Sequence, residues 1–222
     1  MTTRLTELTV QAGDSVVSAV LTAPAECKAA YLLAHGAGAG MRHLFLANMA
    51  ELLAGVGIAT LRYNFPYMEL GKGRVDAPNI CHVTVRAAAA ELMRQLPGVP
   101  LIAGGKSFGG RMTSQAQALE PLVGVSSLAF LGFPLHPPGK PSVDRADHLA
   151  NVKVPMLFLQ GSRDEFAQLA LLHGVVARLG ERARLFLVEG GDHSFGVRKS
   201  AGLTAGQVRA ILCGQIAGLV PE

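Results

Sequence analysis

The sequence predicts an α/β fold with a mostly parallel sheet and helices on both of its faces. Short apolar segments alternate along the 222 residues with segments whose apolar positions have helical spacing. The apolar segments, such as 99–103 and 154–159, are continuous, as expected for strands that are buried on both faces. The first two β-rich segments are instead consecutive, and Gly13 and Asp14 between them form a turn signal. This pattern predicts an antiparallel hairpin at the N-terminus.

Each further element is expected from its own local pattern. Strands are expected at 5–10, 16–21, 29–34, 58–63, 99–103, 126–131, 156–160 and 183–188. Helices are expected at 44–53, 79–96, 108–119, 165–179 and 204–219, with a short helix-like stretch at 144–151. Gly55, Pro97 and Gly180 mark helix ends, and Thr204 is a plausible cap. The interval between the strands at 126–131 and 156–160 is short and Pro-rich, so we expect no cap domain.

Length and composition exclude several classes of protein. The length fits one domain over residues 1–222. With 50% hydrophobic and 16% charged residues and a mean hydropathy of +0.33, the chain is not expected to be disordered. Its apolar runs end after about six residues, whereas a membrane-spanning helix needs about 20. The net charge of +4 is spread over scattered Lys and Arg residues, so we expect no nucleic-acid partner.

The cysteines and the first residues bear on where the protein works. The three cysteines, Cys27, Cys81 and Cys213, are far apart, which predicts neither a disulfide framework nor a metal site. The first residues contain no apolar signal segment. We therefore expect a cytoplasmic protein, either a monomer or a homodimer.

Three predicted strands are followed directly by residues that could form a catalytic set. Ser107 follows the strand at 99–103, Asp164 follows the strand at 156–160, and His193 follows the strand at 183–188. In open α/β sheets, ligands bind at the carboxyl ends of the strands. A serine becomes nucleophilic when an imidazole takes its proton, and a carboxylate orients that imidazole. The order Ser, Asp, His along the chain is the one expected for a hydrolase built on such a sheet.

The nucleophile is indicated by the pattern Gly105-x-Ser107-x-Gly109 between a predicted strand and a predicted helix. Glycines on both sides allow the sharp turn that exposes the serine hydroxyl. In a Gly-rich chain this pattern often arises by chance, so the pattern alone is weak evidence for a nucleophile. Its position between a predicted strand and a predicted helix makes the evidence stronger. The oxyanion would be stabilised by two backbone N–H groups, those of Phe108 and Ala37. No metal or cofactor is required.

The motifs together resemble those of α/β-hydrolases. They occupy residues 35–40 (HGAGAG), 62–66 (RYNFP), 105–111 (GKSFGGR), 161–164 (GSRD) and 191–195 (GDHSF). The chain is similar to the small, lidless group related to dienelactone hydrolases, and most similar to the KANL3/testis-expressed-protein-30-like hydrolase family. The nucleophile of dienelactone hydrolases is a cysteine, whereas Ser107 stands here. The resemblance implies an α/β-hydrolase fold and a hydrolytic reaction class.

Other interpretations of these residues compete with catalysis. Ser107 and Asp164 could act as helix caps, and Glu165 or Asp192 could replace Asp164 as the acid. Residues 104–107 (GGKS) resemble part of a phosphate-binding loop. Such a loop also needs a glycine five residues before Gly105, and Pro100 stands there. His35 is expected to shape its glycine loop rather than to titrate in catalysis. Candidate substrate-binding residues are Gly36, Arg62, Tyr63 and Met68, although Arg62 could instead fix its loop by hydrogen bonds.

The function predicted from these observations is that of a serine hydrolase. It would cleave a small carboxylic ester or thioester through an acyl-enzyme, using Ser107, His193 and Asp164. Two alternatives remain open at this point. One is a binding scaffold that keeps the fold without catalysis, and the other is a peptidase or lactonase that uses the same chemistry.

Overall fold

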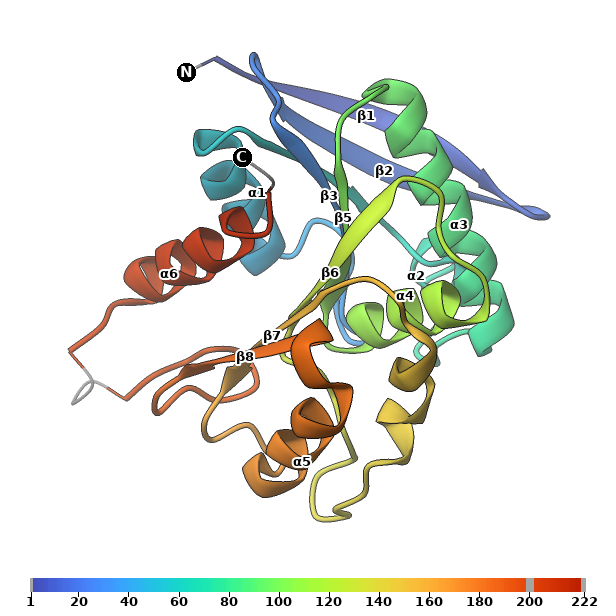
Figure 1. Cartoon of the computed structure of the whole chain (residues 1–222). Coiled ribbons are helices and arrows are strands. Elements are labelled where there is room, and N and C mark those ends of the chain that lie inside the picture. Colours follow the sequence, from blue (N-terminus) through green and yellow to red (C-terminus); the bar gives the residue numbers. More distant parts are fainter. Residues whose placement is uncertain (1, 199–201, 221–222) are drawn as a thin grey trace.

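A computed structural model describes residues 2–198 and 202–220, and these form an eight-stranded sheet (Figure 1). The strands are β1 (Thr3–Ala12), β2 (Ser15–Pro24), β3 (Ala29–Ala34), β4 (Ile58–Tyr63), β5 (Leu101–Lys106), β6 (Val125–Leu131), β7 (Met156–Gly161) and β8 (Ala183–Val188). Their order in the sheet is β1-β2-β4-β3-β5-β6-β7-β8. The strands from β4 to β8 in this order pair in parallel, as the sequence predicts.

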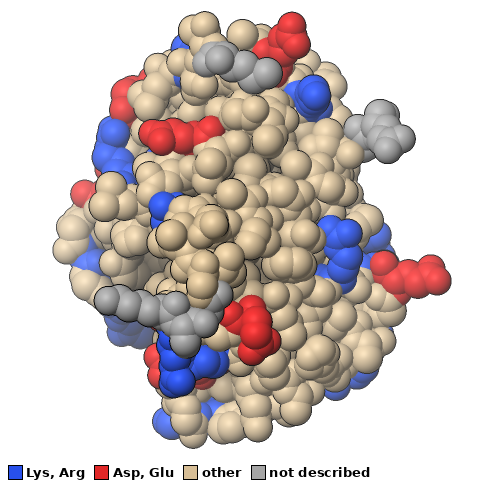
Figure 2. Space-filling model, turned by 90° about the vertical axis from the view of Figure 1, so that its left-hand side faces the viewer, with Lys and Arg blue, Asp and Glu red and all other residues tan. Residues whose placement is uncertain are grey.

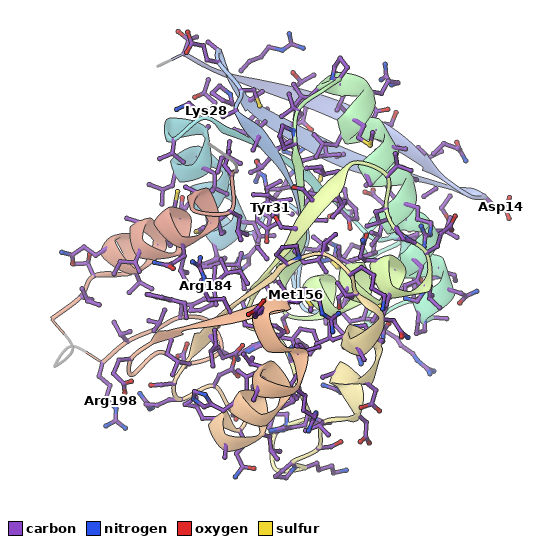
Figure 3. All side chains as sticks on the ribbon, viewed as in Figure 1. Asp14, Lys28, Tyr31, Met156, Arg184 and Arg198 are labelled. Atoms are coloured by element: carbon purple, nitrogen blue, oxygen red, sulfur yellow. The ribbon has the colours of Figure 1, made fainter. Side chains whose placement is uncertain are left out.

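The N-terminal hairpin is the antiparallel part of the sheet. β1 and β2 pair from Thr3 opposite Pro24 to Ala12 opposite Ser15. Gly13, with a φ of +60°, makes the turn, and Asp14 lies at its tip, at the edge of the molecule (Figure 3). β2 then pairs antiparallel with β4, with Ala19 opposite Tyr63. The predicted hairpin is confirmed, and it brings β2 beside the strand that carries Arg62.

Helices cover both faces of the sheet, and each face has its own apolar core. α1 (Leu44–Gly55) and α6 (Ala205–Ala217) pack on one face. α2 (Pro66–Glu69), α3 (Pro78–Gln95), α4 (Phe108–Leu119) and α5 (Leu169–Leu179) contribute to the core on the other. Side chains of β3 alternate between them: Leu32 joins the α3 and α4 core, whereas Tyr31 joins the α1 and α6 core. Tyr31 accordingly lies in the middle of the molecule (Figure 3).

Side chains that bond to the backbone decide where two of the helices begin. α5 begins at Leu169 rather than at 165. The Asp164 carboxylate accepts the Phe166 N–H at 2.8 Å and holds the chain in a turn. Thr204 caps α6 as predicted, in a capping box with Gln207. The short helix α2 was not expected.

The connection from β6 to β7 contains the 3₁₀ helix η1 (Asp144–Asn151) and no separate cap domain in the described chain. The fold class is therefore the predicted α/β-hydrolase fold. No helix in 2–198 or 202–220 is both long and apolar enough to cross a membrane. Lys and Arg lie interspersed with Asp and Glu over the face that Figure 2 shows, which carries no continuous basic patch.

Candidate active site

Ser107 occupies a strained turn between β5 and α4. Its φ of 49° and ψ of −117° lie outside the regions that most residues adopt. The neighbouring glycines are sterically required. A Cβ at Gly105 would lie 2.3 Å from the Ala34 carbonyl oxygen, and one at Gly109 would lie 2.4 Å from the His35 carbonyl oxygen. The motif thus exists because the turn packs directly against the end of β3, and strain of this kind is typical of functional sites.

The structure brings the three predicted catalytic side chains into one hydrogen-bonded chain. His193 Nε2 lies 2.8 Å from Ser107 Oγ, and His193 Nδ1 lies 2.7 Å from Asp164 Oδ2. The Asp164 side chain is fully buried, whereas 19% of the His193 side chain is exposed. The buried end is therefore the carboxylate, and the accessible end is the hydroxyl. This series of hydrogen bonds allows a proton to pass from Ser107 to His193 while Asp164 holds the imidazole.

Gln160, which the sequence analysis missed, orients Asp164. Its Oε1 accepts the Phe133 N–H at 2.9 Å, and its Nε2 donates to Asp164 Oδ2 at 2.5 Å. The other carboxylate oxygen accepts the Phe166 N–H. The buried carboxylate therefore has partners on both oxygens. A polar residue inside the apolar run of β7, four positions before the acid, was the available signal.

The loop that carries His193 is a tight turn built on Asp192. Asp192 Oδ1 accepts the N–H groups of Ser194 and Gly196, both at 2.8 Å. Phe195 has a φ of +62° and is buried, stacking on Phe45 with 5.9 Å between ring centroids. Asp192 is therefore engaged with its own turn, and it is Asp164 that contacts the imidazole.

His35 and Tyr67 fix the glycine loop that follows β3. His35 is fully buried; its Nδ1 lies 2.7 Å from the Gly36 carbonyl oxygen, and its Nε2 is 3.1 Å from the Phe65 N–H. Burial lowers the pKa of His35 to about 4, so its ring is neutral at pH 7. These partners assign the proton to Nδ1, which donates to Gly36, and leave Nε2 to accept. The Tyr67 hydroxyl donates to the Ala37 carbonyl oxygen at 3.0 Å. His35 thus shapes its loop.

Two backbone N–H groups beside Ser107 are available to a ligand. The N–H groups of Ala37 and Phe108 donate to no other group in the described residues. A Cβ at Gly36 would lie 3.8 Å from Ser107 Cβ, so this loop passes directly over the nucleophile. In a trans peptide, the N–H of Ala37 points opposite to the Gly36 carbonyl, which His35 holds. The structure therefore leaves the two predicted oxyanion donors unoccupied.

Ser107 and His193 open into a pocket of about 360 Å³. Its volume lies near the lower end of the range for small-molecule sites. Its apolar wall includes Phe45, Leu46 and Phe166, and the Phe166 ring lies 4.3 Å from the imidazole ring. The complete lining is Gly36, Ala37, Gly38, Ala39, His43, Phe45, Leu46, Lys106, Ser107, Phe166, His193 and Ser194.

Of the four candidate substrate-binding residues, only Gly36 lines this pocket. Arg62 is buried and donates to the Met41 carbonyl oxygen at 3.2 Å and to Thr22 Oγ1 at 3.5 Å. Tyr63 is fully buried in the core. Met68 is partly buried and packs against the same core. Arg62 therefore occupies the loop-fixing position that was its alternative interpretation.

In the described ranges, no three His, Cys, Asp or Glu side chains are grouped so that they could hold a metal ion. The three cysteines are free thiols.

Comparison with curated proteins gives distant relatives. The chain is 27% identical over 196 residues to a Mycobacterium tuberculosis (strain H37Rv) protein named "Putative phosphoribosyl transferase Rv0571c". The match covers 85% of this chain and 42% of that protein, so the chain spans less than half of its relative's length.

Solved structures of similar fold cover nearly the whole chain. A dienelactone hydrolase from Anabaena variabilis has a TM-score of 0.78 and 18% identity, covering 98% of this chain and 96% of its own. The Xanthomonas campestris protein XC6422, described as a serine hydrolase without a lid, has a TM-score of 0.77 and 20% identity, with coverage of 100% and 98%. At these identities the likeness shows the fold. A family comparison matches residues 27–220 to the Alpha/beta hydrolase domain, and the chain belongs to that family.

Proposed function

We propose that the protein is a serine hydrolase that cleaves a carboxylic ester or thioester through an acyl-enzyme. The observation that carries this proposal is the hydrogen-bonded series Ser107–His193–Asp164, with Ser107 Oγ 2.8 Å from His193 Nε2, at the edge of a pocket. We also propose that residues 1–222 form one domain and that the chain belongs to the narrower KANL3-like group.

In the proposed reaction, Ser107 Oγ attacks the acyl carbon as His193 Nε2 takes the hydroxyl proton. The tetrahedral oxyanion is bound by the N–H groups of Ala37 and Phe108. The intermediate collapses, and His193 gives its proton to the departing alkoxide or thiolate. Water then attacks the acyl-enzyme, losing its proton to His193, and the acid is released as the proton returns to Ser107. Asp164 remains ionised throughout and stabilises the imidazolium.

The pocket favours a small, uncharged acyl group. Its wall of Phe45, Leu46 and Phe166 is apolar, and burial of an unpaired carboxylate there would be unfavourable. Lys106, the cation among the lining residues, directs its ammonium to the His193 carbonyl oxygen at 2.6 Å. Because no cap domain encloses the site in the described chain, the leaving group can extend into solvent. Short acyl chains on varied alcohols or thiols fit this shape.

A fluorophosphonate probe tests the proposal because it phosphonylates activated serines. Wild-type protein should be labelled, and Ser107→Ala should not. Ser126→Ala is the matched control, since Ser126 is exposed, bonds to the Leu101 carbonyl oxygen and lies at the amino end of β6. This control should be labelled like wild type. Failure to label wild-type protein would instead support the non-catalytic scaffold.

A substrate panel separates the remaining chemistries. p-Nitrophenyl acetate, butyrate and octanoate, a butyryl thioester, a lactone and an aminoacyl amide would be compared by kcat/KM. We expect the butyrate ester or its thioester to be fastest and the octanoate ester to be slower. Faster turnover of the amide or the lactone would favour the peptidase or lactonase alternative.

A further inference from the structure

We propose that Lys106 is a positioning residue, whose ammonium anchors the main chain at His193 and so holds the imidazole between Ser107 and Asp164. The proposal rests on the proposed function for its kinetic consequences. Its structural basis is independent of the reaction, because it concerns a contact between β5 and the loop after β8.

The two ends of the Lys106 side chain contact different parts of the site. Lys106 is the last residue of β5 and precedes Ser107 directly. Its stem lies under the glycine loop, because a Cβ at Gly36 would be 3.7 Å from Lys106 Cγ. Its Nζ donates to the His193 carbonyl oxygen at 2.6 Å, joining residues 87 positions apart. One side chain therefore links the strand of the nucleophile to the loop of the base.

The ammonium also lies close to the carboxylate end of the triad. The position that a Cβ at Gly132 would occupy is 3.0 Å from Lys106 Nζ, 3.4 Å from the His193 carbonyl oxygen and 3.5 Å from Asp164 Oδ2. Nζ is also 5.6 Å from the centroid of the Phe195 ring, a cation–π distance. The glycine after β6 thus leaves room for three polar atoms to converge.

No other contact in the described chain anchors the His193 carbonyl oxygen. The Asp192 side chain fixes the amides of Ser194 and Gly196, and the imidazole is held by hydrogen bonds at its ring nitrogens and by the Phe166 ring. Without Lys106, the peptide that follows His193 would be held only through the Ser194 N–H, and the ring would lose part of its alignment with Ser107. A misplacement of about 1 Å in a catalytic group can reduce the rate by about 100-fold.

Holding a cation here is unfavourable in itself, which argues against an incidental contact. Burial lowers the pKa of Lys106 to about 8, although the negative charges of Asp164 and Asp192 oppose this shift. The charged or titratable groups facing Nζ are Asp164 on the loop after β7, and Asp192 and His193 on the loop after β8. Above about pH 8 the neutral amine would form a weaker hydrogen bond than the ammonium does.

Lys106→Met tests the proposal because methionine keeps an unbranched apolar side chain and removes the donor. We expect kcat for p-nitrophenyl butyrate to fall about 10- to 100-fold, with KM within about twofold, because the stem that lines the pocket is retained. Lys106→Arg restores a permanent cation and should recover much of kcat. Unchanged kcat in Lys106→Met would overturn the proposal.

The pH profile separates positioning from simple packing. In wild type, kcat/KM should decrease above about pH 8 as the ammonium loses its proton. Lys106→Arg should lack this alkaline decrease, and Lys106→Met should be slow at every pH. An identical alkaline limb in all three proteins would contradict the proposed role.

Amide hydrogen exchange gives a readout that needs no turnover. Peptides covering 189–197 should exchange faster in Lys106→Met than in wild type, while peptides of β3 remain unchanged. If wild-type protein neither takes the fluorophosphonate nor hydrolyses any ester, the proposed function fails, yet this measurement still tests the anchor. Equal exchange in the 189–197 peptides would show that Lys106 does not hold the loop.

Discussion

Two neighbouring regions at the carboxyl edge of the sheet use polar side chains differently. In the triad loops (104–110, 161–168 and 189–196), three reactive side chains bond to one another in series, His193 to Asp164 and to Ser107, and Lys106 and Asp192 bond to the backbone around them. In the supporting loop (62–76), polar side chains bond mainly to backbone groups: Arg62 to the Met41 carbonyl, Asn64 to the Met41 N–H and Tyr67 to the Ala37 carbonyl. The first arrangement can move a proton, whereas the second fixes the path of the glycine loop.

This difference explains why position after a strand is an incomplete guide to chemistry. Ser107 and Arg62 both lie at carboxyl ends of strands, where ligands bind in such sheets. Only Ser107 opens into the pocket; Arg62 is 5% exposed and faces its own chain. The comparison predicts that substitutions in the triad loops change turnover, and that substitutions in the supporting loop change stability first.

The largest effect is expected for His193→Ala. Loss of the general base should lower kcat/KM on the order of 10⁵-fold or more. The melting temperature should change little, because the side chain is partly exposed and contacts solvent through the pocket. The measurement is p-nitrophenyl butyrate hydrolysis together with thermal unfolding. His173→Ala, at an exposed position on α5, serves as the matched control. Retention of esterase activity in His193→Ala would remove His193 from the mechanism.

A second prediction concerns stability in mildly acidic solution. Burial lowers the pKa of His35 to about 4, and burial together with the charges of Arg111 and His82 lowers that of His148 to about 4. Both values lie below the ordinary pKa of about 6.5, so the unfolded chain binds these protons first as the pH falls. The contribution of the two neutral histidines to stability is complete above pH 6.5 and decreases between pH 6.5 and 4.

Chemical denaturation at pH 7.0, 6.0 and 5.0 checks this expectation. The free energy of unfolding should fall by a total of about 2–4 kcal/mol over this interval if both groups contribute. His148→Gln should reduce the slope, because Ser114 Oγ, 2.8 Å from His148 Nε2, can bond to an amide instead. A free energy that stays constant from pH 7 to 5 would show that neither histidine is held neutral by the fold.

A third prediction tests the supporting loop through Arg62→Met. The change removes hydrogen bonds to the Met41 carbonyl oxygen and to Thr22, leaving a buried carbonyl without this donor. We expect the free energy of unfolding to fall by about 1–3 kcal/mol. kcat/KM for short esters should stay within about threefold of wild type, because Arg62 does not line the pocket. A large rise in KM with unchanged stability would indicate that Arg62 binds substrate rather than fixing its loop.

The fold could be predicted from the sequence because its signals are local. The runs at 29–34 and 58–63 are apolar throughout, and both strands have the expected bounds. Ser107, Asp164 and His193 could be chosen because glycines and strand ends mark them. Gln160 was marked only as a polar residue in an apolar run, and its role and that of the Lys106 anchor could not be predicted, because they depend on atoms brought together by folding, such as the Phe133 N–H and the His193 carbonyl. No spacing rule specifies which backbone atom a long side chain will reach.

The smallest expected effect, and the sharpest test of the comparison, is that of Tyr67→Phe. It removes one hydroxyl, which donates to the Ala37 carbonyl oxygen at 3.0 Å, and leaves the buried ring in place. Tyr31→Phe is its matched control, because the Tyr31 hydroxyl donates to the Ala129 carbonyl oxygen at 2.9 Å in the core. Each change should lower the free energy of unfolding by about 1 kcal/mol.

The two variants should differ in turnover, since only Tyr67 contacts the loop that carries the Ala37 N–H. We expect kcat to fall about three- to tenfold in Tyr67→Phe, as the oxyanion donor loses part of its alignment, and to remain unchanged in Tyr31→Phe. Both values come from hydrolysis of one ester at saturating concentration. Equal kcat in the two variants would mean that Tyr67 stabilises the fold without positioning the oxyanion donor. His35 would then be the residue of this region that positions the Ala37 N–H.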